Sequence, residues 1–231
     1  MIEIKIRSRG SSMKEKFKNY IHKDYTFDKS TWVGIFCLII VFAGVFGFLY
    51  EFIFYYFNSG MKQFYYRGGN FLPWINIYAI GAVLIFLFTY KKRKNPLFVF
   101  LVSVITSGVL EYIGGFIMEH IMKVKCWDYS KEILSFGNIN GYVCLRSVLV
   151  FGISSLLLIY VLAPFCFFLA HRMKKKHFLI FSYTLCAIFL FDELYNLIFA
   201  RLFSLPRASE FYKKLGVPYI LSLIHISEPT R

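Results

Sequence analysis

Long apolar stretches separated by short polar connections set the pattern of this chain. A helix of about 20 residues is long enough to cross the roughly 30 Å hydrocarbon core of a bilayer. Because the bilayer offers the backbone no hydrogen-bond partners, stretches that cross it are expected to be helical. The pattern predicts an all-α, polytopic membrane protein with about five transmembrane helices in a domain covering residues 32–200. The expected spans are residues 32–57, 71–90, 97–122, 147–170 and 178–200.

Composition supports this class, since 58% of the residues are hydrophobic, 17% are charged and the mean hydropathy is +0.56. A typical soluble domain has about a quarter of its residues charged. The net charge of +14 comes largely from the N-terminal tail and two short connections, residues 91–95 and 171–177. Such basic clusters orient membrane proteins. No nucleic-acid recognition motif accompanies them, so the expected partner is the lipid bilayer and not a nucleic acid.

The basic clusters also predict an orientation. Residues 1–31 form a basic tail with eight Lys or Arg residues, and with five spans this tail and both basic connections fall on one side. By the positive-inside rule that side is cytoplasmic, and so is the N-terminus. Residues 123–146, between the third and fourth spans, then face the other side. Their polar, turn-rich composition predicts an interfacial or re-entrant loop. Aromatic residues in this loop, together with Trp74, are also typical of the aromatic belt at a membrane–water interface.

The end of the chain fits this topology less well. Residues 201–220 are expected to form an amphipathic C-terminal segment, and they carry four basic residues. That is more than a segment outside the cytoplasm should carry, so either the fifth stretch does not cross fully or a further span follows. Residues 221–231, LSLIHISEPTR, resemble the translation of a sequencing-library adapter. We expect them to be an artefact, and the natural chain to continue past about residue 220.

Carboxylates lie inside the predicted spans, where a charged side chain near the bilayer centre costs a few kcal/mol. Glu111 lies deepest, and in the first and third spans glycines share a helix face with a glutamate, Glu51 or Glu111. Small residues let helices approach closely in lipid, so we expect these two faces to pack together and turn their carboxylates inward. Arg67, Arg146 or the hydroxyl of Tyr112 would neutralise them. Two interpretations stay open: buried ion pairs that fix packing, or a substrate or ion path.

Motifs for common enzymatic chemistry do not occur in the sequence. It contains no G-x-x-x-x-G-K-[ST] loop, no H-E-x-x-H and no C-x-x-C. The sequence therefore predicts no catalytic residue, no metal site and no cofactor. Cys126 and Cys144 flank one loop and could form a disulfide if that loop faces an oxidising compartment.

Four sequence blocks between Gly47 and Phe151 resemble a known family. The blocks are GFLYE, RGGNFLPWINIYAIGAV, LEYIGGFIMEH and CWDYS followed by FGNINGYVCLR. In order and spacing they are similar to the type IV ABC transporter permease family of small bacterial integral membrane proteins. Two positions depart from the family pattern: Asn76 stands where a second proline is usual, and Cys126 with Trp127 where a tryptophan pair is usual.

The resemblance implies a permease subunit in the bacterial cytoplasmic membrane, energised by a separate ATPase that would dock on one of the two basic connections. A second copy of the chain is a further candidate partner. The first hypothesis is thus a transport subunit of unknown substrate. The alternatives are a membrane-embedded enzyme acting on lipid or cell-wall precursors, with Glu111 or Asp128 as acid or base, and a non-transporting scaffold. The candidate residues of a substrate or ion path are Glu51, Arg67, Tyr78, Glu111, Glu119, Asp128, Asn138 and Arg146.

Overall fold

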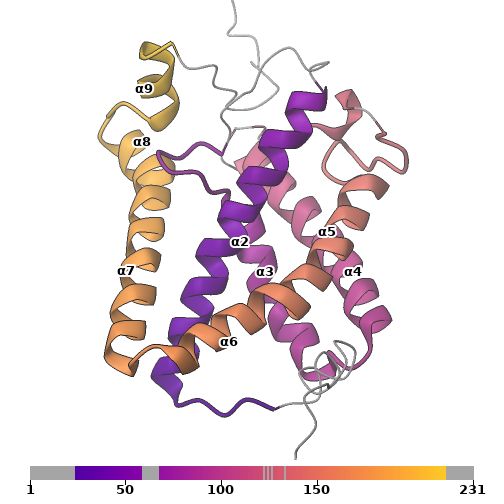
Figure 1. Ribbon diagram of the computed structural model, residues 1–231. Coiled ribbons are helices and arrows are strands. Elements are labelled where there is room, and N and C mark those ends of the chain that lie inside the picture. Colours follow the sequence, from indigo (N-terminus) through magenta and orange to yellow (C-terminus); the bar gives the residue numbers. More distant parts are fainter. Residues whose placement is uncertain are drawn as a thin grey trace, which may run out of the picture.

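The computed structural model describes residues 24–58, 68–121, 123, 125, 127–132 and 134–216. Most of the basic tail, Arg67, Cys126 and the expected artefact at residues 221–231 lie outside them. The described part is a helical bundle (Figure 1). Its helices are α2 (Lys29–Asn58), α3 (Asn76–Thr89), α4 (Pro96–Phe116), α5 (Leu145–Leu157), α6 (Ala163–Arg172), α7 (Lys175–Leu194), α8 (Ala200–Leu202) and α9 (Ala208–Lys214).

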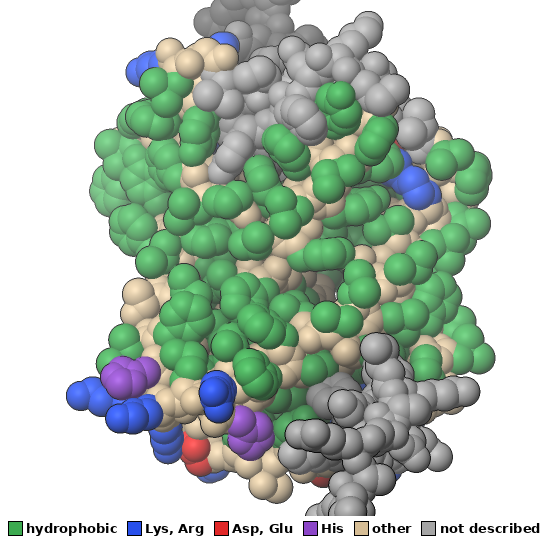
Figure 2. All heavy atoms as spheres, in the orientation of Figure 1, with side chains coloured by type: hydrophobic (Ala, Val, Ile, Leu, Met, Phe, Trp, Pro, Cys, Tyr) green, Lys and Arg blue, Asp and Glu red, His purple; other side chains and the backbone are tan. Residues whose placement is uncertain are grey.

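Four helices among the described residues are long and apolar enough to cross a membrane. Three of them continue through single π-helical turns, so that α5 and α6 form one span and α7 runs on past Leu194. The spans are Lys29–Phe57, Pro96–Ile121, Leu145–Arg172 and Lys175–Phe199. Hydrophobic side chains cover the middle of the bundle's visible face (Figure 2). The all-α, multi-pass membrane class predicted from the sequence is confirmed, but the predicted number of five spanning helices is wrong.

The second apolar stretch, residues 71–90, does not form a full spanning helix, because only part of it is helical. Helix α3 begins at Asn76 and has 14 residues, which corresponds to about 21 Å. Gly68 and Gly69 precede it with φ angles of 107° and 81°, in the left-handed region, and Pro73 supplies no backbone N–H. The Ile75 N–H donates to the carbonyl of Gly44, close to the middle of α2, over 3.0 Å. Helix α3 therefore starts inside the bundle, and residues 68–75, the break segment, form non-helical backbone there.

The basic clusters gather at one end of the bundle, where α2 begins. Arg93, between α3 and α4, lies 3.0 Å from Asp24, and Lys175, at the start of α7, lies 3.0 Å from Asp28. We call this the basic end. The opposite end carries residues 127–144, the outer loop (Figure 1). The two basic connections thus share one end as predicted, while most of the basic tail lies outside the described residues and the compartment that this end faces stays a prediction.

The glycine faces do not pack against each other, so this prediction is wrong. A Cβ atom at Gly47 would lie 2.2 Å from the Tyr78 ring, and one at Gly115 would lie 2.7 Å from Tyr142. The glycines of α2 and α4 thus receive aromatic rings from α3 and the outer loop. Trp74 and Tyr142 are each only 5% exposed, so both rings lie inside the bundle.

Candidate functional site

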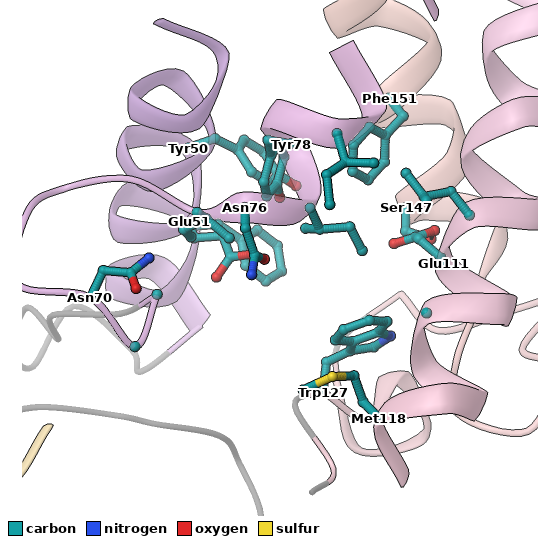
Figure 3. Close-up of a pocket in the computed structure, with 18 of the residues that line it drawn as sticks. Tyr50, Glu51, Asn70, Asn76, Tyr78, Glu111, Met118, Trp127, Ser147 and Phe151 are labelled. Carbon is teal, nitrogen blue, oxygen red and sulfur yellow. Dashed lines mark hydrogen bonds between the residues drawn. The ribbon is translucent and has the colours of Figure 1, made fainter. Parts of the chain in front are cut away.

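A cavity of about 320 Å³ lies in the half of the bundle nearer the outer loop. Its walls come from α2, the break segment, the start of α3, α4, the outer loop, α5 and the end of α7. Figure 3 shows Glu51 with Asn76 on one side, Glu111 with Ser147 on the other, and Trp127 with Met118 below them. Among the described residues, the glutamates that line it are Glu51, Glu111, Glu132 and Glu193. The cavity therefore combines carboxylates from four separate segments.

The break segment is stabilised by two consecutive carboxylates of α7. Asp192 accepts hydrogen bonds from the backbone N–H groups of Phe71 and Leu72, at 3.0 and 2.9 Å. Both acidic residues are buried, at 5% and 6% exposure. Non-helical backbone at membrane depth needs such partners, because lipid provides none. The carboxylate of Asp192 thus explains how the chain can leave the helical conformation inside the bundle.

Glu193 accepts hydrogen bonds from side chains on both sides of the break segment. One carboxylate oxygen accepts from Asn70 Nδ2 at 2.7 Å, and the other accepts from Asn76 Nδ2 at 3.2 Å. Asn76 is one of the positions that depart from the family pattern, and its amide gives Glu193 a second donor where a proline would give none. The carboxylate of Glu193 also lines the cavity, so the break and the cavity share one acidic group.

The C-terminal segment closes over the break. Asn196 lies in the π-helical turn after α7, and its side chain accepts from the backbone of Ala208 at 2.9 Å. The Tyr212 hydroxyl of α9 donates to the carbonyl of Phe71 at 2.7 Å. Arg207 and Ser209 add to the cavity lining. Arg207 and Ser209 of the C-terminal segment are thus part of the site.

Glu111 is almost fully buried, with 1% of its surface exposed. The Tyr129 hydroxyl donates to one carboxylate oxygen, and Ser147 Oγ donates to the other at 2.8 Å. The prediction that this carboxylate lies inside the bundle with polar partners is confirmed. Its partners are hydroxyls from the outer loop and α5, whereas neighbours on α2 had been expected.

Arg146 also lines the cavity, and its ion-pair partner is Glu132. The Arg146 Nη2 atom lies 2.5 Å from Glu132, whose other oxygen accepts from the Tyr55 hydroxyl. The guanidinium carbon lies 4.5 Å from the Phe54 ring centroid and 5.4 Å from that of Tyr129. The positive charge of Arg146 is therefore taken up by one carboxylate and two ring faces.

Glu119 and Asp128 lie outside the cavity lining and hold the outer loop. Lys125 Nζ lies 3.7 Å from Glu119 and 3.2 Å from Asp128, and Ser130 donates to Asp128 from its backbone N–H at 3.0 Å. Tyr142 donates to Glu119 at 2.8 Å. Burial opposes ionisation of Asp128, but the hydrogen bonds from Ser130 and Lys125 outweigh it, and the pKa of Asp128 lies below its usual range.

Asn138 likewise shapes the loop. Its side-chain oxygen accepts from the backbone of Gly141 at 2.7 Å, and Gly141 has a φ of 76°. A Cβ atom at Gly141 would lie 2.5 Å from Asp128 Oδ1, so only glycine fits there. Of the candidate path residues, Glu51, Tyr78, Glu111 and Arg146 line the cavity, Glu119, Asp128 and Asn138 do not, and Arg67 lies outside the described residues.

Sequence reasoning did not select several residues that the cavity brings together. Glu193 was visible as a carboxylate in an apolar stretch, and Glu132 as an acidic residue of the outer loop, but neither had an evident partner in sequence. The other polar lining residues that were missed include Asn70, Asn76, Tyr129, Ser147 and Asn196. Within the described part of the chain, no group of three or more His, Cys, Asp or Glu side chains could hold a metal ion.

Comparisons with known proteins agree with the resemblance seen in the sequence. No curated protein and no solved structure matches the chain. A family model described as "Putative ABC-transporter type IV" matches residues 38–197. The matched range contains the break segment, the four glutamates of the cavity and Arg146. The chain therefore belongs to the type IV ABC-transporter family of membrane proteins.

Proposed function

We propose that the chain is a permease-type transport subunit of the bacterial cytoplasmic membrane and that the cavity is its substrate-binding site. The observation that carries this proposal is the position of the cavity at a broken span. Transporters commonly bind substrate where a helix is interrupted inside the membrane, because unwound backbone and polar side chains can face the ligand there. Here the interruption before α3 contributes Asn70 to the lining, and the first residue of α3 contributes Asn76.

Burial and charge support the same function. Carboxylates inside a membrane domain are costly and typically mark a substrate or ion pathway. Glu51 and Glu111 line one cavity from two different helices, α2 and α4. A purely structural role would need only internally paired groups, and would not need an enclosed volume between them.

A separate ATPase subunit would drive transport by docking at the basic end, which is then the cytoplasmic end. Lys91, Lys92 and Lys94 are exposed there, and the lysines at the start of α7 lie at the same end. Arg93 is only 5% exposed and donates to the Tyr90 carbonyl at 3.0 Å, so it fixes the turn. The exposed lysines of this turn can meet an acidic surface, whereas Arg93 holds the turn that presents them.

The docking proposal is tested by replacing Lys91, Lys92 and Lys94 together with glutamine in a chain co-expressed with candidate ATPase subunits from the same genome. We expect co-purification of the two subunits to be lost. The matched control replaces Lys213 and Lys214 at the other end of the bundle, and we expect it to leave co-purification intact. Equal loss in both variants would contradict a docking surface at the basic end.

The site is tested by ATP hydrolysis of the reconstituted complex. Glu51→Gln should lower substrate-stimulated hydrolysis several-fold, because it removes a charge from the cavity. Glu119→Gln, which changes a glutamate outside the cavity lining, should leave hydrolysis within about twofold of the native rate. Chemical turnover of a lipid or cell-wall precursor without ATP would favour the enzyme alternative. Full activity of Glu51→Gln would contradict the proposed site.

A further inference from the structure

A second pocket adjoins the cavity and is almost entirely apolar. It has a volume of about 440 Å³ and lies between α2, α3 and the span formed by α5 and α6. Its lining includes Phe42, Ala43 and Leu158. Val161 and Leu49, which also line it, are 60% and 50% exposed on the outer surface of the bundle. We call this pocket the crevice, and its open side faces the lipid.

The cavity and the crevice share two residues, Tyr78 and Phe151. Their rings are stacked, with centroids 5.0 Å apart, and Figure 3 shows both at the edge of the cavity. Tyr50 continues the row, 6.3 Å from Tyr78, and Phe54 stacks 5.9 Å beyond Tyr50. A continuous row of rings thus leads from the acidic cavity to the apolar crevice.

The chemistry of the cavity favours a positively charged group. Among the described residues, the four glutamates of the lining face two guanidinium groups, those of Arg146 and Arg207. Aromatic faces attract organic cations, and the rings of Phe54 and Tyr129 already hold one cation, the side chain of Arg146. The charge of Arg146 is already paired with Glu132 through Nη2, and its Nε and Nη1 are buried without a hydrogen-bond partner among the described residues, so they are not exposed to the cavity.

We propose that the cavity and the crevice together bind one amphiphilic organic cation, with its ammonium head in the cavity and its alkyl chain in the crevice. The proposal rests on the proposed function, because it names the substrate class of the same site. The shared pair Tyr78 and Phe151 lies where the head joins the chain. A ligand of this kind reaches the cavity laterally from the bilayer, through the lipid-facing side of the crevice.

An inorganic cation would not use this architecture. Metal ions prefer oxygen ligands and gain little from a row of ring faces or from an apolar crevice. An alkylammonium ion uses both, because its head is weakly hydrated and its chain gains free energy on leaving water. The shape of the joined pockets therefore separates these two classes of cation.

The test measures ligand binding to the purified chain in lipid nanodiscs. The readout is the fluorescence of Trp127, which lines the cavity. The probes are tetramethylammonium, butyltrimethylammonium and hexyltrimethylammonium, with 1-hexanol and hexanesulfonate as neutral and anionic comparisons. Empty nanodiscs correct for partition into lipid, and Trp127→Phe corrects for the signal of the other tryptophans. We expect only the ammonium compounds to bind, with affinity rising roughly threefold to fourfold for each added methylene.

Two variants separate the head from the chain. Glu51→Gln should weaken all the ammonium compounds by about tenfold, whereas Glu119→Gln should not change their affinity. Val161→Phe, which fills the crevice at a lipid-exposed position, should remove the gain with chain length and leave tetramethylammonium binding unchanged.

Equal or tighter binding of 1-hexanol or hexanesulfonate would overturn the cationic head. Affinity independent of chain length, or an unchanged chain-length series in Val161→Phe, would overturn the use of the crevice. The absence of binding by all three ammonium compounds would overturn the substrate class as a whole. None of these results removes the transport site, which fails only if ATP hydrolysis does not respond to Glu51→Gln.

Discussion

The two halves of the bundle differ in what they bury. The half near the basic end has a dry core in which Ile35, Leu38, Phe167 and Phe178 are completely or almost completely buried. The half near the outer loop buries Glu111, Asp192, Glu193 and Asn70, and it encloses the cavity. The same apolar helices run through both halves, so the difference comes from where α3 begins. The acidic cavity lies where the chain in front of α3 is not helical, whereas the crevice beside the helical part of α3 is apolar.

The largest effect on stability is expected in the dry half. Phe178 has no exposed surface, and Phe178→Ala should destabilise the chain by about 3–5 kcal/mol because it leaves a cavity in a close-packed core. Thermal unfolding in detergent measures the loss. Ligand binding at the outer-loop half should persist below the lowered unfolding temperature. A loss of binding without a loss of stability would contradict the separation of the two halves.

The second prediction concerns the break segment. Asp192→Ala leaves two partly buried backbone N–H groups without their acceptor and should cost about 1–3 kcal/mol. Asp192→Asn keeps one carbonyl oxygen and should cost less. Both are compared by thermal unfolding. If Asp192→Ala were as stable as the native chain, the carboxylate would not be what holds the break.

The third prediction sharpens the role of Glu111. Glu111→Leu leaves the Tyr129 hydroxyl without its acceptor, whereas Ser147 keeps the Cys144 carbonyl, and the change should cost about 1–2 kcal/mol. Glu111→Gln keeps the shape and one acceptor oxygen, so it should keep the fold and reduce transport. Unfolding and ATP hydrolysis are measured on the same preparations. A fully active Glu111→Gln variant would restrict Glu111 to a structural role.

The smallest expected effect is the pH dependence of the outer loop. The pKa of Asp128 in the folded chain lies below its unfolded value of about 4. Its contribution to stability is therefore complete above about pH 4 and is lost as the pH falls further. Asp128→Asn should flatten the acid side of the profile of unfolding temperature against pH. An unchanged acid limb would mean that Asp128 does not stabilise the loop through its charge.

The sequence predicts the membrane class well because apolar length is a local property. The break is harder to predict, since it depends on Asp192 and Glu193, which lie about 120 residues further along the chain than their partners. Gly68, Gly69 and Pro73 were the available local signals for an interruption. They did not outweigh the hydropathy of residues 71–90, and a full span was predicted there.

The candidate site was predicted in part for a similar reason. Glu111 could be identified because a buried carboxylate in an apolar helix is unusual whatever surrounds it. Glu119 and Asp128 lie near Glu111 in sequence. Both carboxylates pair with Lys125, however, and so they contact the outer loop and not the cavity. Glu132 reaches the cavity only because the outer loop folds back to Arg146. Contacts of this kind depend on tertiary structure that periodicity does not report.

The contrast between a dry half and an acidic, accessible half is tested most directly by thiol labelling. Single cysteines are placed at Met118, which lines the cavity, and at Leu38, which has no exposed surface, in a background without the five native cysteines. Each is treated with a cationic and an anionic methanethiosulfonate reagent. The account predicts that Met118→Cys reacts, faster with the cationic reagent, and that Leu38→Cys does not react. Equal rates at the two positions, or faster labelling of Met118→Cys by the anionic reagent, would contradict it.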